Sequence, residues 1–238
     1  AGGAFGAYQA GAWSALAQEF QPDLFVGTSI GSVHAWLLAG GLPAEELHRI
    51  WLDPASSLPL KPRFPRSWRD GVFDNRPLEQ RLRHLHELVS PQREVGIVAV
   101  SWKGLDSQLF QNQEITWEHL AASCAVPFVL RQPRIDGRTY MDGGILDSVN
   151  VWAAIQLGAT RIIAINCWKP RSPWWLDWPV GWIAAQKRKN GERHAARSGA
   201  AAVRIEVIEP AGTLGTFKDS LFWNRTNVEA WYEAGFRD

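Results

Sequence analysis

The stretch D-L-F-V-G-T-S-I-G, Asp23–Gly31, is the strongest indication of fold in this chain. Leu24–Val26 is a short apolar run of the kind that forms a buried strand, and Ser32–Ala39 is predicted to be the helix that follows it. The sequence G-T-S-I-G, Gly27–Gly31, therefore covers a sharp bend from strand to helix. We expect both of its outer glycines to be required, because a Cβ there would collide with the neighbouring backbone.

Ser29 stands at the centre of this bend. A tight strand-to-helix turn lifts the serine Oγ clear of the sheet and places it at the N-terminus of a helix. Unpaired N–H groups and the positive end of the helix dipole favour a developing negative charge there. The position predicts a nucleophile, and the alternative is a serine that only caps the helix.

The chain begins with a glycine-rich turn, A-G-G-A-F-G (Ala1–Gly6), followed by a predicted helix over Ala7–Phe20. Consecutive backbone N–H groups in such a turn can hold an anion, as they do in phosphate loops and oxyanion holes. No Gly-Lys-Ser/Thr follows, so the turn is not a Walker A loop. In an α/β unit a strand normally leads into such a turn, and the sequence given has no strand ahead of it.

A second candidate group comes from R-I-D-G-R-T-Y-M-D-G-G, in which Asp136-Gly137 is a strong hairpin signal. The second strand of this hairpin, Arg138–Met141, ends at Asp142, and two glycines follow. Asp142 is a candidate catalytic carboxylate, and the alternative is an Asx-turn that only shapes the backbone.

Further periodic segments alternate along the rest of the chain. The predicted helices are Ala44–Trp51, Pro77–Val89, Trp117–Cys124, Ser148–Leu157 and Thr226–Phe236, the last with a capping box from Thr226 to Glu229. The predicted strands are Val95–Val100, Gln108–Gln111, Arg161–Asn166 and Val203–Ile208. This alternation predicts an α/β protein with a mostly parallel central sheet and helices on both faces.

Length and composition limit the remaining possibilities. The 238 residues contain no linker-like break, so we expect one domain over residues 1–238. A net charge of +1 gives no basic footprint for nucleic acid. Cys124 and Cys167 form no C-x-x-C pair, which argues against zinc and disulfides and fits a reducing compartment. No apolar run is long enough to span a bilayer, so the expected location is cytoplasmic or peripheral to a membrane.

The chain carries 14 tryptophans, and several gather in W-K-P-R-S-P-W-W-L-D-W-P-V-G-W, Trp168–Trp182. Basic residues follow this stretch, so that residues of about 168–200 have the composition of a lid or of a transient membrane-surface contact. The alternative is a tryptophan-rich cover over the apolar core.

Three pieces in this order, A-G-G-A-F-G, G-T-S-I-G and D-G-G, together resemble the patatin-like phospholipase family. The likeness extends to about Asn166 and includes A-S-C-A-V-P-F, Ala122–Phe128. Two positions depart from the family pattern: Ala1 stands where relatives have a third glycine, and Phe5 where many have Arg or Lys.

The resemblance implies a three-layer α/β/α sandwich and a lipid acyl hydrolase or esterase with a Ser-Asp dyad. Position by position, Ser29 matches the nucleophile and Asp142 the dyad carboxylate. Gly2, Gly3 and Ala4 match the oxyanion loop. No metal or other cofactor is implied, and the partner is a lipid or small ester substrate.

The sequence leaves two alternative hypotheses about function open. One is an α/β-hydrolase esterase with a Ser-Asp-His triad, which would need His194 as its histidine. Only 28 residues precede Ser29, fewer than that fold needs before its nucleophile. The other is a lipid-binding protein of the same fold whose catalysis is impaired.

Overall fold

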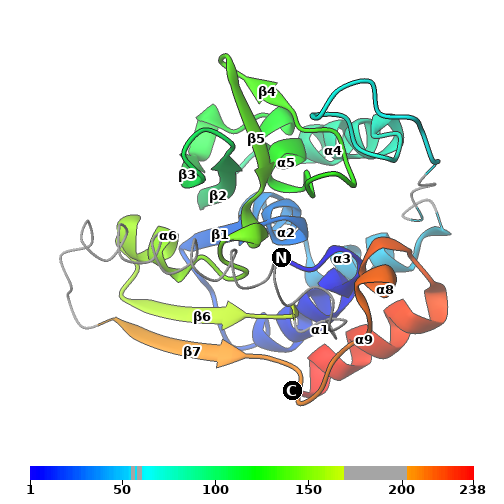
Figure 1. Cartoon of the computed structure of the whole chain (residues 1–238). Coiled ribbons are helices and arrows are strands. Elements are labelled where there is room, and N and C mark those ends of the chain that lie inside the picture. The colour runs from blue at the N-terminus through cyan, green and yellow to red at the C-terminus, as the bar shows by residue number, and fades with distance from the viewer. Residues whose placement is uncertain (55–56, 58–60, 169–202) are drawn as a thin grey trace.

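The computed structural model describes residues 1–54, 57, 61–168 and 203–238, which form strands and helices in layers (Figure 1). The strands are β1 (Leu24–Thr28), β2 (Glu94–Ser101), β3 (Asp106–Gln111), β4 (Arg134–Ile135), β5 (Arg138–Asp142), β6 (Arg161–Ile165) and β7 (Arg204–Ile208). The α-helices are α1 (Gly6–Leu16), α2 (Ile30–Ala39), α3 (Ala44–Leu52), α4 (Arg76–Leu88), α5 (Trp117–Ser123), α6 (Val151–Gln156), α8 (Phe217–Leu221) and α9 (Arg225–Arg237). Short 3-10 helices are η1 (Gly3–Phe5), η3 (Asn112–Glu114) and η4 (Gly143–Ile145).

Strand β2 is the centre of a mixed five-stranded sheet. Strand β1 runs parallel to β2, whereas β3 and β5 are antiparallel to it, and β4 forms a hairpin with β5. The α/β class is confirmed, but the expectation of a mostly parallel sheet is wrong for this sheet. No helix separates β2 from β3 or β4 from β5, and a short turn can join only antiparallel neighbours.

Helices cover the strands on both sides. Helix α2 packs on β1 and β2, α5 packs on β2 and β5, and α4 covers α2 and α5. Helices α1, α3 and α9 pack together and extend the same core, while α6 contacts β1, β2 and β6. The largest fully buried side chains of this core include Phe5, Tyr8, Leu37, Leu47, Ile97 and Leu120.

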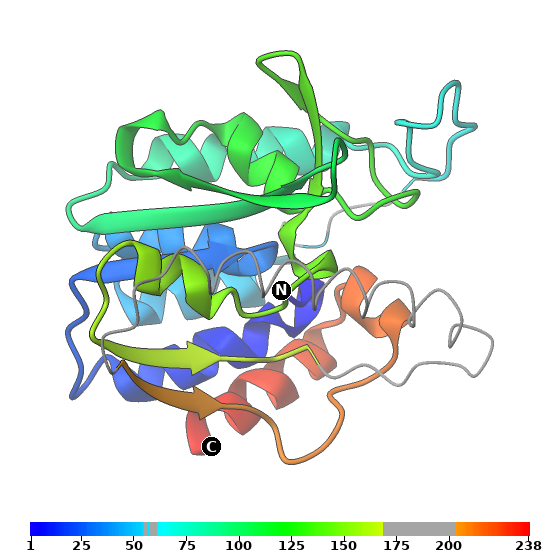
Figure 2. The same ribbon diagram turned by 60° about the vertical axis from the view of Figure 1, so that its left-hand side comes forward.

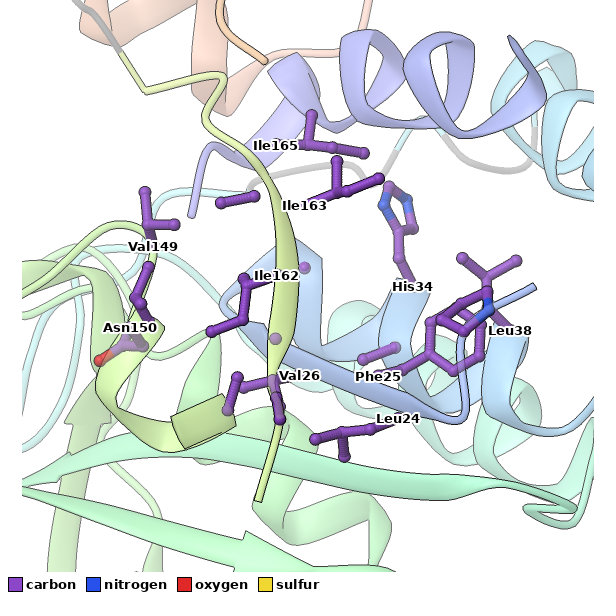
Figure 3. Close-up of a pocket in the computed structure, with 18 of the residues that line it drawn as sticks. Leu24, Phe25, Val26, His34, Leu38, Val149, Asn150, Ile162, Ile163 and Ile165 are labelled. Atoms are coloured by element: carbon purple, nitrogen blue, oxygen red, sulfur yellow. The ribbon is translucent and has the colours of Figure 1, made fainter. Parts of the chain in front are cut away.

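Strands β6 and β7 form a separate parallel pair, which lies apart from the five-stranded sheet in both views (Figures 1 and 2). Within the described residues β1 pairs only with β2, and β6 pairs only with β7, so each keeps one open edge. A cavity of about 440 Å³ lies between them. Val26 of β1, Ile162 of β6 and His34 of α2 are among its lining residues (Figure 3).

Several element ends differ from the prediction. Helix α1 ends at Leu16 rather than at Phe20, and α8 was not predicted. Helix α9 is capped by Asn224, whose side chain accepts a hydrogen bond from the Asn227 N–H, so the predicted capping box from Thr226 is wrong. The tryptophan-rich segment and the basic residues after it lie outside the described residues, except for Trp168.

Two further observations concern the cysteines and the hydropathy of the helices. Both cysteines fall within the described residues and are unpaired. Among the helices described, none combines the length and the hydropathy that a bilayer crossing requires.

Candidate active site

Ser29 occupies the single residue between β1 and α2. Its φ of 55° and ψ of −133° are rare for a residue with a side chain, and such strain is kept where the surrounding structure enforces it. A Cβ on Gly27 would overlap the carbonyl oxygen of Gly31, so glycine is required at position 27. A Cβ on Gly31 would meet nothing closer than 3.7 Å, so the expectation that both glycines are required is wrong for Gly31.

Asp142 reaches Ser29 because of how two strands share one edge of β2. Strand β3 occupies one edge of β2 along Gly96–Ser101, so β1 and β5 both lie on the other edge. There Thr28 pairs with Val98, and Asp142 pairs with Ala99, the next residue of β2. The two strands therefore end head to head, and the residues at their ends meet.

The close approach of these strand ends depends on Gly143. A Cβ at this position would overlap Thr28 Oγ1 and the Val98 carbonyl oxygen. The first glycine of D-G-G therefore lets the end of β5 lie against the end of β1. The side chain of Asp142 is then directed at Ser29, and Ser29 Oγ donates a hydrogen bond of 2.7 Å to Asp142 Oδ2.

A second set of hydrogen bonds fixes both groups. The Ser29 N–H donates to Ser123 Oγ (2.8 Å), and this hydroxyl donates to the Val98 carbonyl (2.7 Å). The Asp142 N–H donates to the Ala125 carbonyl at 2.9 Å. Ser123 and Ala125 lie in the A-S-C-A-V-P-F stretch, Ser123 acting through its side-chain hydroxyl and Ala125 through its backbone carbonyl. The sequence assigned neither residue a role, because both contacts join segments that are far apart in the chain.

Asp142 is 4 % exposed, and Ser29 is 6 % exposed. Burial raises the pKa of Asp142, while the hydrogen bonds from Ser29 Oγ and from the Gly144 N–H (2.7 Å to Oδ1) oppose that rise. A carboxylate with a raised pKa is a stronger proton acceptor. The pair therefore consists of a hydroxyl donor and a carboxylate whose affinity for a proton exceeds that of an exposed aspartate.

The glycine-rich turn lies beside this pair. Ala1 packs so closely on Gly144 that a Cβ there would overlap it, and Gly6 packs on Ile30, the residue after Ser29. Between these two contacts run Gly2, Gly3 and Ala4, with φ angles of 157° at Gly2 and 55° at Gly3.

Glycine is required at both positions, since a Cβ on Gly2 would overlap Cys167 Sγ and one on Gly3 the Ser220 carbonyl. The predicted oxyanion residues are thus brought to the same place as Ser29 and Asp142.

Histidines take no part in this arrangement within the described residues. His34 lies on α2, where its Nε2 accepts a hydrogen bond from the Trp51 indole (3.0 Å), and burial lowers its pKa to about 3. None of the five described histidines hydrogen-bonds to Ser29 or Asp142, and His194 lies outside the described residues. Nor do the described His, Cys, Asp and Glu side chains form a group of three that could hold a metal ion.

The cavity between β1 and β6 is a different place from this pair. It is lined by β1, β6, α2 and the residues before α6, and neither Ser29 nor Asp142 contributes to its wall (Figure 3). The cavity lies between the open edges of β1 and β6, so it is a feature of strand pairing and not part of the Ser29 site.

Fold and site together define an α/β protein with a serine on a strand-to-helix turn and an aspartate beside it. The sequence profile of patatin-like phospholipases matches residues 1–155, and the chain belongs to this family. The crystal structure of VipD from Legionella pneumophila has the same fold, with a TM-score of 0.50 and 12 % sequence identity. That match covers 99 % of this chain and 64 % of VipD, so the chain spans less than two thirds of that protein. No curated protein matches the chain in sequence.

Proposed function

We propose that this protein hydrolyses carboxylic esters of lipids with Ser29 as the nucleophile and Asp142 as the general base. The observation that carries the proposal is the 2.7 Å hydrogen bond from Ser29 Oγ to Asp142 Oδ2. A serine hydroxyl is a weak nucleophile until a positioned base accepts its proton. Membership of the patatin-like phospholipase family supports a lipid acyl group as the substrate.

In the first half of the reaction, Ser29 Oγ attacks the ester carbonyl carbon while its proton moves to Asp142 Oδ2. The carbonyl oxygen becomes an oxyanion. When the tetrahedral intermediate collapses, the bond to the leaving oxygen breaks and Asp142 returns the proton to that oxygen. An alcohol leaves, and the acyl group remains on Ser29.

In the second half, water takes the place of the alcohol. Asp142 accepts a proton from the water as its oxygen attacks the acyl carbon, and the same proton returns to Ser29 Oγ when the acyl–serine bond breaks. The product is a carboxylic acid, and both side chains regain their starting states.

Backbone N–H groups of Gly2, Gly3 and Ala4 are the proposed donors to the oxyanion. The Ser29 N–H is already engaged by Ser123 Oγ, so donors from another segment are needed. Each donor aimed at a developing oxyanion contributes about 3 kcal/mol to transition-state stabilisation. Phe5 supplies no positive charge here, so the backbone carries this task.

The two alternatives make different demands. A Ser-Asp-His triad needs a histidine between Ser29 and Asp142, whereas the two side chains are in direct contact. A lipid-binding protein without turnover needs no activated serine, so reactivity of Ser29 discriminates it from an enzyme.

Labelling with a fluorophosphonate tests the proposal. We expect intact-mass analysis to give one adduct on the unmodified chain, none on Ser29→Ala, and one on Ser14→Ala, a matched control on α1. A chromogenic short-chain ester should be hydrolysed by the first and third proteins only. Equal labelling of Ser29→Ala would refute the role of Ser29, and the absence of both labelling and turnover in the unmodified chain would favour the binding protein.

A further inference from the structure

A loop rich in aromatic and basic residues projects its apolar side chains into solvent. This interface loop, residues 61–74, reads K-P-R-F-P-R-S-W-R-D-G-V-F-D. Phe64 is 96 % exposed, Trp68 58 % and Val72 44 %. Large apolar side chains gathered on one exposed segment mark a surface that binds something.

The interface loop is held in a fixed conformation by its own hydrogen bonds. Pro62 and Phe73 form a β-bridge, and the Arg63 N–H donates to the Val72 carbonyl at 2.8 Å. At the tip, Asp70 Oδ2 accepts from the N–H groups of Arg66 (2.9 Å) and Ser67 (3.1 Å). The aromatic side chains are thus presented outward by an ordered scaffold.

Two aromatic residues outside the loop extend the apolar surface. Trp102 stands edge-on to Trp68, with ring centroids 5.1 Å apart, and Phe128 stands edge-on to Trp102 at 6.3 Å. Phe128 is 67 % exposed and has a φ of 65°, a conformation that bulky residues seldom adopt. An exposed aromatic kept in a strained conformation is a second sign of function at this surface.

The interface loop is also cationic. It holds four basic residues, Lys61, Arg63, Arg66 and Arg69, against the two acids Asp70 and Asp74. Arg63 pairs with Asp70 at 3.3 Å, and Asp74 pairs with Arg76 beyond the loop, so both acids are already neutralised. Lys61 and Arg66 are both exposed, and they lie on either side of Phe64 in the sequence. The surface therefore combines aromatic rings with an excess of positive charge.

The interface loop contacts two segments near the proposed active site. One holds Asp142 in place, and the other covers the glycine-rich turn. The Val72 N–H donates to the carbonyl of Phe128 (3.0 Å), three residues after Ala125, which binds the Asp142 N–H. On the other side, Phe73 contacts Phe222 edge-on at 6.5 Å, next to α8, which covers Gly3. Both views show the loop and α8 on the same side of the molecule (Figures 1 and 2).

We propose that the interface loop, with Trp102 and Phe128, docks the protein onto the surface of an anionic phospholipid bilayer. Aromatic rings settle at the boundary between headgroups and acyl chains, and lysine and arginine are attracted to anionic headgroups. A surface that binds a partner protein has an apolar centre, with charged residues confined to its rim. In the interface loop, cationic residues and aromatic rings instead alternate along the sequence. This proposal rests on the proposed function, because docking would bring a lipid hydrolase to its substrate.

Vesicle sedimentation of the Ser29→Ala protein tests docking without turnover. We expect binding to vesicles of equal parts phosphatidylserine and phosphatidylcholine, and much weaker binding to phosphatidylcholine alone. The double variants Phe64→Ser/Trp68→Ser and Lys61→Glu/Arg66→Glu should each lower the partition coefficient at least about tenfold. Val207→Ser and Arg237→Glu, exposed on β7 and α9, are the matched controls and should bind normally.

Activity measurements separate this inference from the proposed function. With Ser29 intact, the two loop variants should keep the rate on a water-soluble ester and the Tm, and lose hydrolysis of vesicle lipid. Normal vesicle binding by both loop variants, or no binding by the parent, overturns the docking surface while soluble-ester hydrolysis upholds the enzyme. Loop-dependent vesicle binding without any hydrolysis upholds the docking surface and overturns the proposed function.

Discussion

Ser29 Oγ lies 2.7 Å from Asp142 Oδ2, although 113 residues separate them in the sequence. The contact exists because β1 and β5 lie on the same edge of β2, and their last residues pair with two consecutive residues of β2, Val98 and Ala99. Gly144 N–H holds the second carboxylate oxygen at 2.7 Å, so the carboxyl group has a single orientation. The proposed base is fixed in this way without a histidine to hold it.

Replacing Asp142 by Asn should lower kcat by about 10³-fold, because the amide cannot accept the serine proton. The fold should persist, since the Asn oxygen can still accept from the Gly144 N–H and its NH₂ can donate to Ser29 Oγ. Steady-state kinetics together with Tm measure both effects.

The matched control is Asp147→Asn, five residues after Asp142, whose side chain accepts a hydrogen bond from the Val149 N–H at 3.1 Å. It should keep kcat within a few-fold, as should His194→Ala. If Asp142→Asn stays active while His194→Ala is dead, the dyad is wrong and a triad operates.

The stability of Asp142→Asn should depend on pH in a defined direction. Burial raises the pKa of Asp142 in the folded protein, so ionising this group costs stability as pH rises through the folded pKa. Asn removes that cost, and each tenfold change in proton affinity corresponds to about 1.4 kcal/mol. The variant should therefore gain Tm relative to the parent at neutral pH, and the gain should vanish in acid.

Asp219→Asn provides a control of opposite sign. The hydrogen bonds from Thr216 lower the pKa of Asp219, so its ionised form stabilises the fold. This variant should lose Tm at neutral pH and recover in acid. A pH-independent difference for Asp142→Asn would show that its carboxyl group titrates normally.

The two outer glycines of G-T-S-I-G should respond differently to alanine. Gly27→Ala places a Cβ on the Gly31 carbonyl oxygen, and we expect a loss of at least about 2 kcal/mol together with the activity. Gly31 lies within α2 and has room for a methyl group, so Gly31→Ala should be neutral or stabilising by about 0.5–1 kcal/mol. Chemical denaturation of both variants measures the contrast, and equal destabilisation would contradict it.

A strand added ahead of Ala1 should stabilise the protein. The cavity between β1 and β6 has two open strand edges, Ala1 is part of its wall, and Gln9 Oε1 within it is a buried acceptor without a partner among the described residues. A six-residue apolar, β-branched extension would pair with those edges, cover apolar surface and bring N–H groups beside Gln9.

A Gly/Ser extension of the same length is the control for this experiment. Each kcal/mol gained should raise Tm by roughly 2–4 °C in a chain of this size. Amide hydrogen exchange should slow in β1 and β6 with the apolar extension only. Equal Tm values for the two extensions would mean that the cavity does not accept a strand.

The local features of this protein can be predicted from its amino-acid sequence. The elements around Ser29 and the Asp136-Gly137 hairpin follow from periodicity and turn chemistry, which act over a few residues. The three motifs also indicate the patatin-like phospholipase family, because glycine, serine and aspartate at those spacings report backbone shape directly.

The assembly of the site and the direction of the strands depend on contacts between distant segments, which local sequence patterns do not contain. The shared edge of β2 brings Asp142 to Ser29, and the antiparallel returns of β3 and β5 make the sheet mixed. Ser123 Oγ accepts a hydrogen bond from the N–H of Ser29, the proposed nucleophile, across 94 residues of sequence. Whether a glycine is required also depends on which atoms the folded backbone brings close to it. The Gly31 carbonyl oxygen lies where a Cβ on Gly27 would be, whereas no such atom lies near Gly31. Contacts between segments depend on how strands pair, and pairing is a property of the whole chain.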